Sequence, residues 1–227
     1  QIPAIDAVIE GFESTDRGKL IMAPGTGKTY TSMAIAERMA DKKKGDVFRV
    51  LYLVPSIQLL SQTLKGWTQD TNYTMDSIAV CSDRKVTKKE AEEGQVDIAS
   101  IDIGYPATTN TAKLMEYYKR IENDPNKGDF LTVFSTYQSI DVIIEAQKQG
   151  FYDFDLIVCD EAHRTTGSVA LGEANTSFTK VHSNENIRGA NRLYQTATPR
   201  VYGDNVKQKA DENSIVLYEM SNTDLFG

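Results

Sequence analysis

A glycine-rich stretch between an apolar run and a helical pattern constrains the fold of this chain more than any other feature. Lys19 to Ala23 is a short apolar run, Pro24 to Gly27 interrupts it, and Lys28 to Lys44 then shows helical spacing up to Gly45. A strand that enters a helix through such a loop is typical of α/β folds. Since the glycines let backbone N–H groups point inward beside the positive end of the helix dipole, the loop is suited to bind phosphate.

Strands and helices alternate along the rest of the chain. Val50 to Val54 is an uninterrupted apolar run, as in a strand buried on both faces, and Ser56 is a candidate N-cap for a helix through Trp67. Further strands are predicted at Ser77 to Cys81, Leu131 to Ser135, Leu156 to Cys159, Arg192 to Thr196 and Ser214 to Tyr218, with a helix at Ile140 to Lys148. This alternation predicts an α/β fold whose mainly parallel sheet is flanked by helices on both faces.

Size and composition restrict the class of protein. The chain has 227 residues, enough for one substantial α/β domain, so we expect residues 1–227 to form a single domain. Its 40% hydrophobic and 25% charged residues exclude collagenous and disordered classes. No apolar run approaches the roughly 20 residues that cross a bilayer, so no membrane partner is expected. The net charge of −7 argues against a strongly basic nucleic-acid-coating protein but permits a few phosphate contacts.

One stretch departs from the alternating pattern. Residues 84–128 are charged and polar with weak periodicity, including Arg84-Lys85 and the run from Lys88 to Glu90. We expect a polar insertion of helices and loop with a solvated surface, and no role follows from its residues.

Two features bear on the cellular location. Cys81 and Cys159 each end an apolar run, which predicts buried thiols and fits a reducing cytoplasm better than a disulfide scaffold. The chain starts at Gln1 without a leader-like segment, which a processed chain would also lack, and such a start suggests a fragment of a longer protein. A cytoplasmic location is the expectation.

The loop contains the residue types needed to bind a nucleoside triphosphate. Lys28 would place a charge on the β and γ phosphates, and the Thr29 hydroxyl is placed to ligate Mg²⁺. The other residues of the loop expected to bind the cofactor are Pro24, Gly25, Thr26 and Gly27, with the backbone N–H groups supplied by the last three because proline has none. The full pattern has a glycine at the position of Met22, so this is a shortened form of the loop. A glycine-rich turn without a ligand is the alternative.

Two carboxylates follow the apolar run that ends at Cys159. Asp160 and Glu161 therefore lie at the carboxyl edge of the predicted sheet, where α/β folds bind ligands. Asp160 is suited to hold Mg²⁺, and Glu161 to orient and deprotonate the water that attacks a phosphoanhydride. The alternative is that both residues only cap the next helix. His163 and His182 lack the neighbouring Cys or His ligands of a zinc site, so metal binding by histidine is not expected.

Taken in order, these motifs resemble the first RecA-like lobe of superfamily 2 helicases and translocases over nearly the whole chain. Residues Asp160 to His163 resemble the DEAH box, so the resemblance adds His163 to the catalytic set of Lys28, Asp160 and Glu161. Gln1 matches the glutamine that reads adenine in such proteins. The resemblance implies a three-layer P-loop NTPase fold of the RecA-like type, with ATP and Mg²⁺ as cofactors.

Three further segments resemble motifs that contact nucleic acid or couple nucleotide state to movement. Residues 196–198 resemble motif III, the coupling motif, while two strand ends resemble motifs Ia and Ib, which in the family face the nucleic-acid backbone. The DNA-binding or coupling residues so implied are Pro55, Ser56, Thr136, Tyr137, Gln138, Arg164, Thr196 and Thr198. Motifs Ia and Ib also have a purely structural explanation, as a serine-capped turn and a strand end.

The amino-acid sequences of several segments are similar to those of the motors of restriction enzymes, especially the single-chain type ISP group. These segments are Leu20 to Ala23, Leu53 to Ser56, Val80 to Asp83, Phe134 to Ser139 and Asp160 to Gly167. The resemblance implies the ATP-binding half of a bacterial motor that couples ATP hydrolysis to movement on double-stranded DNA. It also implies nuclease and methyltransferase domains as partners in a parent chain. No counterpart of motifs IV to VI follows Thr198, so a second RecA-like lobe is expected to be absent and the hydrolase incomplete.

Other functions stay open at this point. A type I or type III restriction motor or a DNA repair helicase would share the same lobe. A P-loop ATPase switch or remodelling protein that does not act on nucleic acid needs only the loop and the acidic pair. A catalytically silent scaffold is disfavoured, because every loop and acidic residue for nucleotide chemistry is present.

Overall fold

The computed structural model describes residues 1–43, 45–81, 107–162, 180–197 and 215–220, and structural statements below concern these ranges. Eight strands form one sheet in the order β4-β3-β5-β2-β6-β7-β1-β8, and every described strand pair is parallel. The strands are β1 (Arg17–Ile21), β2 (Phe48–Val54), β3 (Met75–Val80), β4 (Ala107–Thr108), β5 (Phe130–Thr136), β6 (Phe154–Cys159), β7 (Gly189–Thr196) and β8 (Ile215–Glu219).

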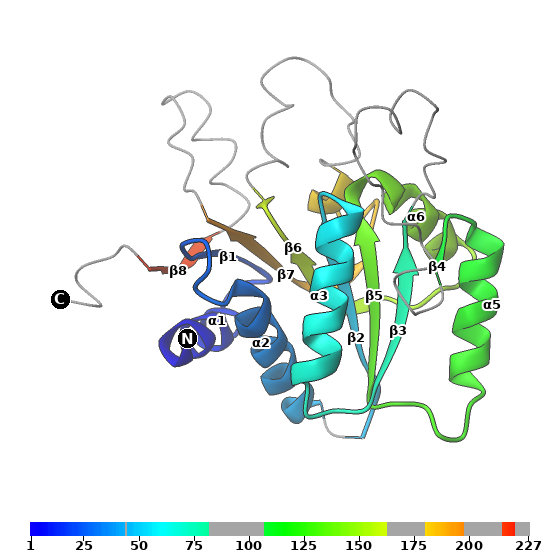
Figure 1. Cartoon of the computed structure of the whole chain (residues 1–227), viewed down its shortest axis with the longest axis horizontal. Helices are drawn as coiled ribbons and strands as arrows, with labels where there is room; N and C mark the ends of the chain where they lie inside the picture. The colour runs from blue at the N-terminus through cyan, green and yellow to red at the C-terminus, as the bar shows by residue number, and fades with distance from the viewer. Residues whose placement is uncertain (44, 82–106, 163–179, 198–214, 221–227) are drawn as a thin grey trace, which may run out of the picture.

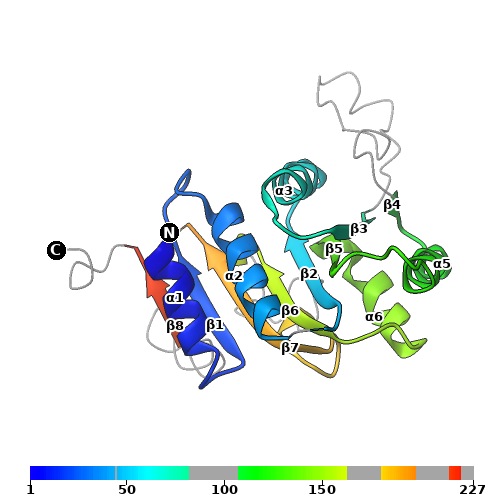
Figure 2. The same ribbon diagram turned by 90° about the horizontal axis from the view of Figure 1, so that it is seen from below.

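Helices cover both faces of this sheet (Figures 1 and 2). One face packs against α1 (Ile2–Gly11), α2 (Lys28–Lys42) and α3 (Ile57–Asp70). The other face packs against α5 (Thr111–Glu122) and α6 (Ile140–Lys148). Two short 3₁₀ turns, η2 (Tyr137–Ser139) and η5 (Lys180–His182), complete the described elements. The predicted three-layer α/β fold with a parallel sheet is confirmed.

Burial explains the strand pattern. The central strands β2, β5 and β6 are sandwiched between helices, and all seven residues of β5 are buried. Alternate residues of each strand enter two separate cores, so Tyr52 packs under α3 against Trp67 while Leu51 faces α6. Uninterrupted apolar runs are therefore what these strands require.

The predicted elements are found with shifted ends. Ser56 is the N-cap of α3, because its side chain accepts a hydrogen bond from the Leu59 N–H at 3.3 Å, as predicted. The first strand runs from Arg17 to Ile21 rather than from Lys19 to Ala23, since its pairing with β7 starts at Arg17 and Ala23 is exposed. Helix α1 was not predicted, although its buried Ala4, Ile5 and Val8 repeat at helical spacing.

Part of the expected polar insertion belongs to the layered fold. Residues 82–106 lie outside the described ranges, but β4 pairs with β3 at the sheet edge and α5 packs against α6. Leu114 of α5 is fully buried, and the Asn110 side chain accepts hydrogen bonds from the first turn of the helix. Residues 107–128 are therefore not only a solvated surface, because Leu114, Met115 and Ile121 of α5 pack against the core.

Both cysteines are buried free thiols, as predicted. Within the described ranges, no helix combines the length and apolar character that crossing a membrane requires.

Candidate functional site

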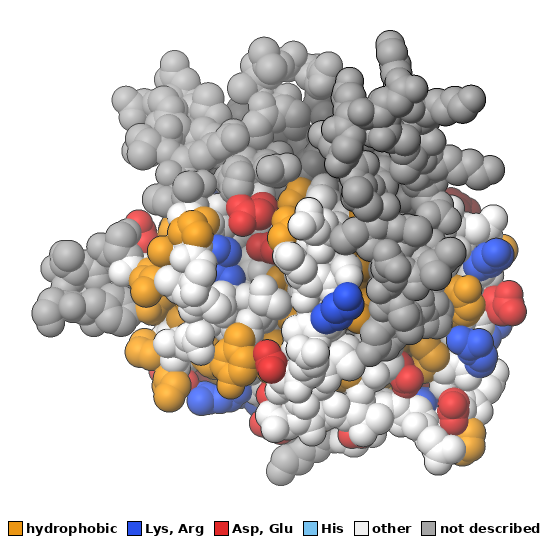
Figure 3. All heavy atoms as spheres, viewed as in Figure 1, with side chains coloured by type: hydrophobic (Ala, Val, Ile, Leu, Met, Phe, Trp, Pro, Cys, Tyr) orange, Lys and Arg blue, Asp and Glu red, His pale blue; other side chains and the backbone are white. Residues whose placement is uncertain are grey.

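The carboxyl edge of the sheet gathers the predicted site residues from distant parts of the sequence. The glycine loop follows β1, Pro55 follows β2, Tyr137 follows β5 and Asp160 follows β6. Because all these strands are parallel, their carboxyl ends meet at one edge, which lies at the top of the view in Figure 1. In the space-filling view from the same direction, basic and acidic side chains lie next to one another near the upper ends of α2 and α3 (Figure 3).

The loop has the conformation that its glycines allow. Gly25 and Gly27 have φ angles of 75° and 88°, in the left-handed region that a side chain would strain, and Gly27 is the N-cap of α2. A Cβ at Gly25 would meet no heavy atom within 4 Å, so this glycine is needed for its backbone angle. The Thr26 hydroxyl closes the turn by donating to the Ala23 carbonyl at 2.7 Å, and the Lys28 ammonium donates to the Met22 carbonyl at 3.5 Å.

Gln1 lies against this loop, as expected of a residue that contributes to the same site. Its amide Nε2 donates to the Thr26 carbonyl oxygen at 3.1 Å. A Cβ at Gly27 would approach the Gln1 Nε2 to 2.2 Å, so the end of the Gln1 side chain lies directly against this glycine. The contact depends on α1, which packs against α2 and the sheet.

Asp160 is almost completely buried, with 7% of its surface exposed. Its Oδ1 accepts hydrogen bonds from the Glu161 backbone N–H at 2.9 Å and from the Gln195 Nε2 at 3.0 Å. Burial raises the pKa of the Asp160 carboxyl, the charge of Glu161 adds to this, and the Gln195 hydrogen bond and the Lys28 charge oppose it. Glu161, the proposed base, has a φ of 51°, which is unusual for a residue with a side chain.

Two residues of this site were missed by sequence reasoning. Tyr52 of β2 and Gln195 of β7 are fully buried, and the Gln195 amide donates to the Tyr52 hydroxyl as well as to Asp160. Burial raises the pKa of the Tyr52 hydroxyl well above its usual value, and the charge of Asp160 adds to this shift. The sequence signal that could have indicated them was the polar residue Gln195 within the predicted strand from Arg192 to Thr196.

Of the residues predicted to face nucleic acid, Ser56 and Gln138 are exposed. They lie at neighbouring strand ends, and the Gln138 Nε2 donates to the Pro55 carbonyl at 3.4 Å. Pro55 and Thr136 are buried.

Tyr137 lies directly after β5 and is not exposed. Its side chain is fully buried, and its hydroxyl donates to the Asp160 carbonyl oxygen at 2.8 Å. The residue therefore connects the end of β5 to the acidic pair.

Thr196 is the last residue of β7 and is buried, and its carbonyl accepts a hydrogen bond from the Met22 N–H at 3.1 Å. This bond ties the coupling segment to the start of the glycine loop. His163, Arg164 and Thr198 lie outside the described residues.

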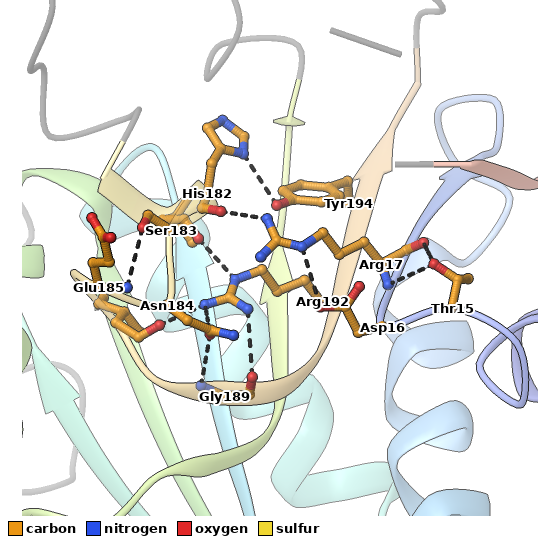
Figure 4. A network of polar contacts seen from close by, with 12 residues as sticks. Thr15, Asp16, Arg17, His182, Ser183, Asn184, Glu185, Gly189, Arg192 and Tyr194 are labelled. Carbon is orange, nitrogen blue, oxygen red and sulfur yellow. Dashed lines mark hydrogen bonds and ion pairs between the residues drawn. The ribbon is translucent and has the colours of Figure 1, made fainter. Parts of the chain in front are cut away.

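A second polar network lies at the start of β7 (Figure 4). Arg192 is fully buried and donates to backbone carbonyls of Val181, Ile187 and Gly189 and to the Asn184 side chain. Burial lowers the pKa of this guanidinium.

His182 belongs to the same network. Its Nδ1 lies 3.1 Å from the Tyr194 hydroxyl, and its carbonyl accepts a hydrogen bond from Arg17. Across the described ranges, no three His, Cys, Asp or Glu side chains come together in a way that could hold a metal ion.

The donor set fits Mg²⁺ bound with a nucleotide phosphate. Mg²⁺ prefers oxygen ligands and is held in such sites by one or two protein groups together with phosphates. Thr29 supplies a hydroxyl and Asp160 a carboxylate, and within the described ranges Oδ2 of Asp160 makes no hydrogen bond while Oδ1 makes two. The left-handed glycines and the helix N-terminus meet the requirements of the phosphate itself.

Comparison with known proteins identifies similar sequences over most of the chain. Residues 1–201 match the family described as type III restriction enzyme, res subunit. A probable helicase of African swine fever virus is 32% identical over 184 residues, which is 81% of this chain and 17% of the viral protein.

Two solved structures are similar in both sequence and fold. The type ISP restriction-modification enzyme LlaGI, in complex with a DNA substrate mimic, is 45% identical with a TM-score of 0.76 over 98% of this chain and 19% of that one. The type ISP enzyme LlaBIII, bound to DNA, is 46% identical with a TM-score of 0.81 over 96% of this chain and 14% of that one. The helicase domain of Hef from Pyrococcus furiosus, at 19% identity and a TM-score of 0.57 over 99% of this chain and 39% of that one, shares the fold. The chain thus spans less than a fifth of the viral protein and of the two type ISP enzymes.

Proposed function

From its membership of the type III restriction enzyme res subunit family, we propose that this chain is the ATP-binding half of a motor that couples ATP hydrolysis to movement on double-stranded DNA. The chain is a helicase-type ATPase domain related to the motors of type ISP restriction-modification enzymes. The observation that carries the proposal is the meeting of the glycine loop and the Asp160-Glu161 pair at one sheet edge, in a chain 46% identical to an enzyme described as ATP-dependent and bound to DNA.

The residues at this edge have different roles in the proposed ATP hydrolysis. The backbone N–H groups of residues 25–27 and the Lys28 ammonium hold the phosphates, while Pro24 and Gln1 contribute to the nucleotide site beside them. Thr29 and Asp160 would hold Mg²⁺, which when bound neutralises charge that develops on the phosphates. Glu161 accepts the proton of the attacking water, and His163 belongs to the same motif.

The coupling to DNA runs through the strand ends next to this site. The hydrogen bonds from Tyr137 to Asp160 and from Met22 to Thr196 link the acidic pair and the glycine loop to the ends of β5 and β7. Exposed Ser56 and Gln138 lie on the same edge and are the described candidates for phosphate-backbone contacts. Arg164 and Thr198 complete the proposed set of DNA-binding or coupling residues.

We further propose that this domain works inside a longer bacterial restriction-modification chain in the cytoplasm. Its partners would be a second RecA-like lobe, a nuclease and a methyltransferase. The support is that it covers 19% and 14% of the LlaGI and LlaBIII chains.

Nucleotide binding by variants of the 227-residue chain tests the proposal. Lys28→Ala should lose ATP binding in equilibrium titrations with a fluorescent ATP analogue, because it removes the charge on the phosphates. Glu161→Gln should bind ATP normally in the 227-residue chain, and the same change in the whole parent protein should abolish hydrolysis. Lys42→Ala is the matched control, since Lys42 ends the same helix but is exposed and paired with Glu13. Unchanged ATP affinity of Lys28→Ala would refute the proposal.

The DNA part of the proposal needs the whole parent protein. Its ATP hydrolysis should be measured without DNA, with single-stranded DNA and with long linear duplex, at one salt concentration. Stimulation by duplex supports a translocase of the restriction type. Stimulation by single strands alone would favour an unwinding or repair helicase, and indifference to DNA would favour a switch or remodelling ATPase.

A further inference from the structure

Three buried polar side chains form a group behind the candidate nucleotide site. Tyr52, Asp160 and Gln195 come from the neighbouring strands β2, β6 and β7, and their exposed fractions are 0%, 7% and 0%. The register explains why they meet. Tyr52 of β2 pairs with Val158 of β6, and Cys159 of β6 pairs with Tyr194 of β7. Asp160 directly follows Cys159 and Gln195 directly follows Tyr194, so these two residues occupy matching positions at the ends of neighbouring strands. Because side chains alternate, all three belong to the face that α2 and α3 cover.

The Gln195 amide joins the other two. Its Nε2 donates one hydrogen bond to the Tyr52 hydroxyl and one to the Asp160 Oδ1 at 3.0 Å. The amide therefore connects Tyr52 of β2 to Asp160, one of the two residues proposed to hold Mg²⁺.

The oxygen of the Gln195 amide differs from its nitrogen in its contacts. Its Oε1 is buried and has no hydrogen-bond partner among the residues that the structure describes. A buried oxygen without a partner costs folding stability. The Nε2 contacts on Asp160 and Tyr52 are the one gain that the amide offers.

We propose that Gln195, held by Tyr52, is a positioning residue for Asp160. By fixing Oδ1, the amide turns the carboxylate so that Oδ2 faces the metal bound with the nucleotide. Since Thr196 ends β7 directly after Gln195, a shift of this strand end also moves the donor on Asp160. The inference rests on the proposed function, because it assigns a role toward the Mg²⁺ of bound ATP.

The test separates metal binding from nucleotide binding. A fluorescent ATP analogue is titrated into the 227-residue chain in EDTA and at increasing Mg²⁺. Gln195→Leu should raise the Mg²⁺ concentration for half-maximal tight binding about 10- to 100-fold, as loss of outer-shell partners does in other metal sites. Binding in EDTA should stay the same. Thermal unfolding of Gln195→Leu should be checked alongside, since the variant removes the unpartnered oxygen but also takes a donor from the Tyr52 hydroxyl and from Asp160 Oδ1, and binding in EDTA shows that the nucleotide site is still folded.

Two further variants keep the inference falsifiable. Tyr52→Phe removes only the hydroxyl that holds the amide, so it should raise the Mg²⁺ requirement by a smaller factor. Gln147→Leu is the matched control, because Gln147 is also a buried amide but bonds Tyr152 and Arg188 on the opposite face of the sheet. Its Mg²⁺ requirement should equal that of the unmodified chain.

The outcomes are distinguishable. If the unmodified chain fails to bind the analogue with Mg²⁺, the proposed function fails and this inference falls with it. If the unmodified chain binds and Gln195→Leu and Tyr52→Phe keep its Mg²⁺ requirement, the positioning role alone is overturned. An equal rise in Gln147→Leu would also overturn it, since the effect would then be general to lost buried amides.

Discussion

At the scale of single residues, Asp160 shows that this site is built at a cost to folding. Its carboxyl is buried and its pKa is raised, chiefly by desolvation. The folded state therefore holds the proton more tightly than the unfolded chain does. It follows that the contribution of this group to stability is fully present below the unfolded-state pKa and is lost as the pH rises through the folded-state pKa. Burial of the ionised form of Asp160 therefore costs folding stability in the chain without metal.

The expected result is that Asp160→Asn makes the metal-free chain more stable at neutral pH. The gain should be on the order of 1 kcal/mol, or about 2–4 °C in melting temperature for a chain of this size. Thermal unfolding in EDTA measures it, and the difference from the unmodified chain should shrink at acid pH. A lower melting temperature for Asp160→Asn at neutral pH would contradict the assignment.

At the scale of elements, the segment between η5 and β7 is held by one buried guanidinium. Arg192 donates to three backbone carbonyls and to the Asn184 side chain (Figure 4). Those acceptors would lose their donors in Arg192→Leu, and each buried orphan costs about 1–3 kcal/mol. We expect the free energy of unfolding to fall by about 3 kcal/mol or more in urea titrations.

A surface arginine provides the comparison for this element. Arg38 is about half exposed and pairs with Asp6 at 2.8 Å. Because exposed ion pairs contribute about 0–1 kcal/mol, Arg38→Leu should change stability little. Equal losses for the two variants would show that the guanidinium does not hold the segment.

At the scale of the whole molecule, the proposed motor site needs more than this lobe. In the family that the chain resembles, an arginine of the second lobe reaches the γ-phosphate, and such arginines accelerate phosphoryl transfer by about 10³–10⁵. We therefore expect the 227-residue chain to bind ATP but to hydrolyse it very slowly, measured as phosphate release under single-turnover conditions. Rapid turnover by this chain alone would refute the division of the site between two lobes.

Much of the fold and of the site could be predicted because the signals are local. The glycine loop, the Ser56 cap and the apolar runs of β2 and β6 each depend on neighbouring residues in the chain. Helix α1 and helix α5 could not be predicted in the same way. Both carry apolar residues at helical spacing, but α5 lies within a stretch that is otherwise charged and polar, and α1 is a single short helix at the start of the chain.

The sequence by itself determined the parallel α/β fold, the phosphate loop and the acidic pair, because backbone conformation and strand burial are encoded by short runs of residue types. Only the tertiary structure decided that Gln195 and Tyr52 hold Asp160 and that Tyr137 is buried beneath it. These contacts depend on the order and register of β2, β5, β6 and β7. Pairing between strands far apart in the chain leaves no local trace in the residues that it brings together.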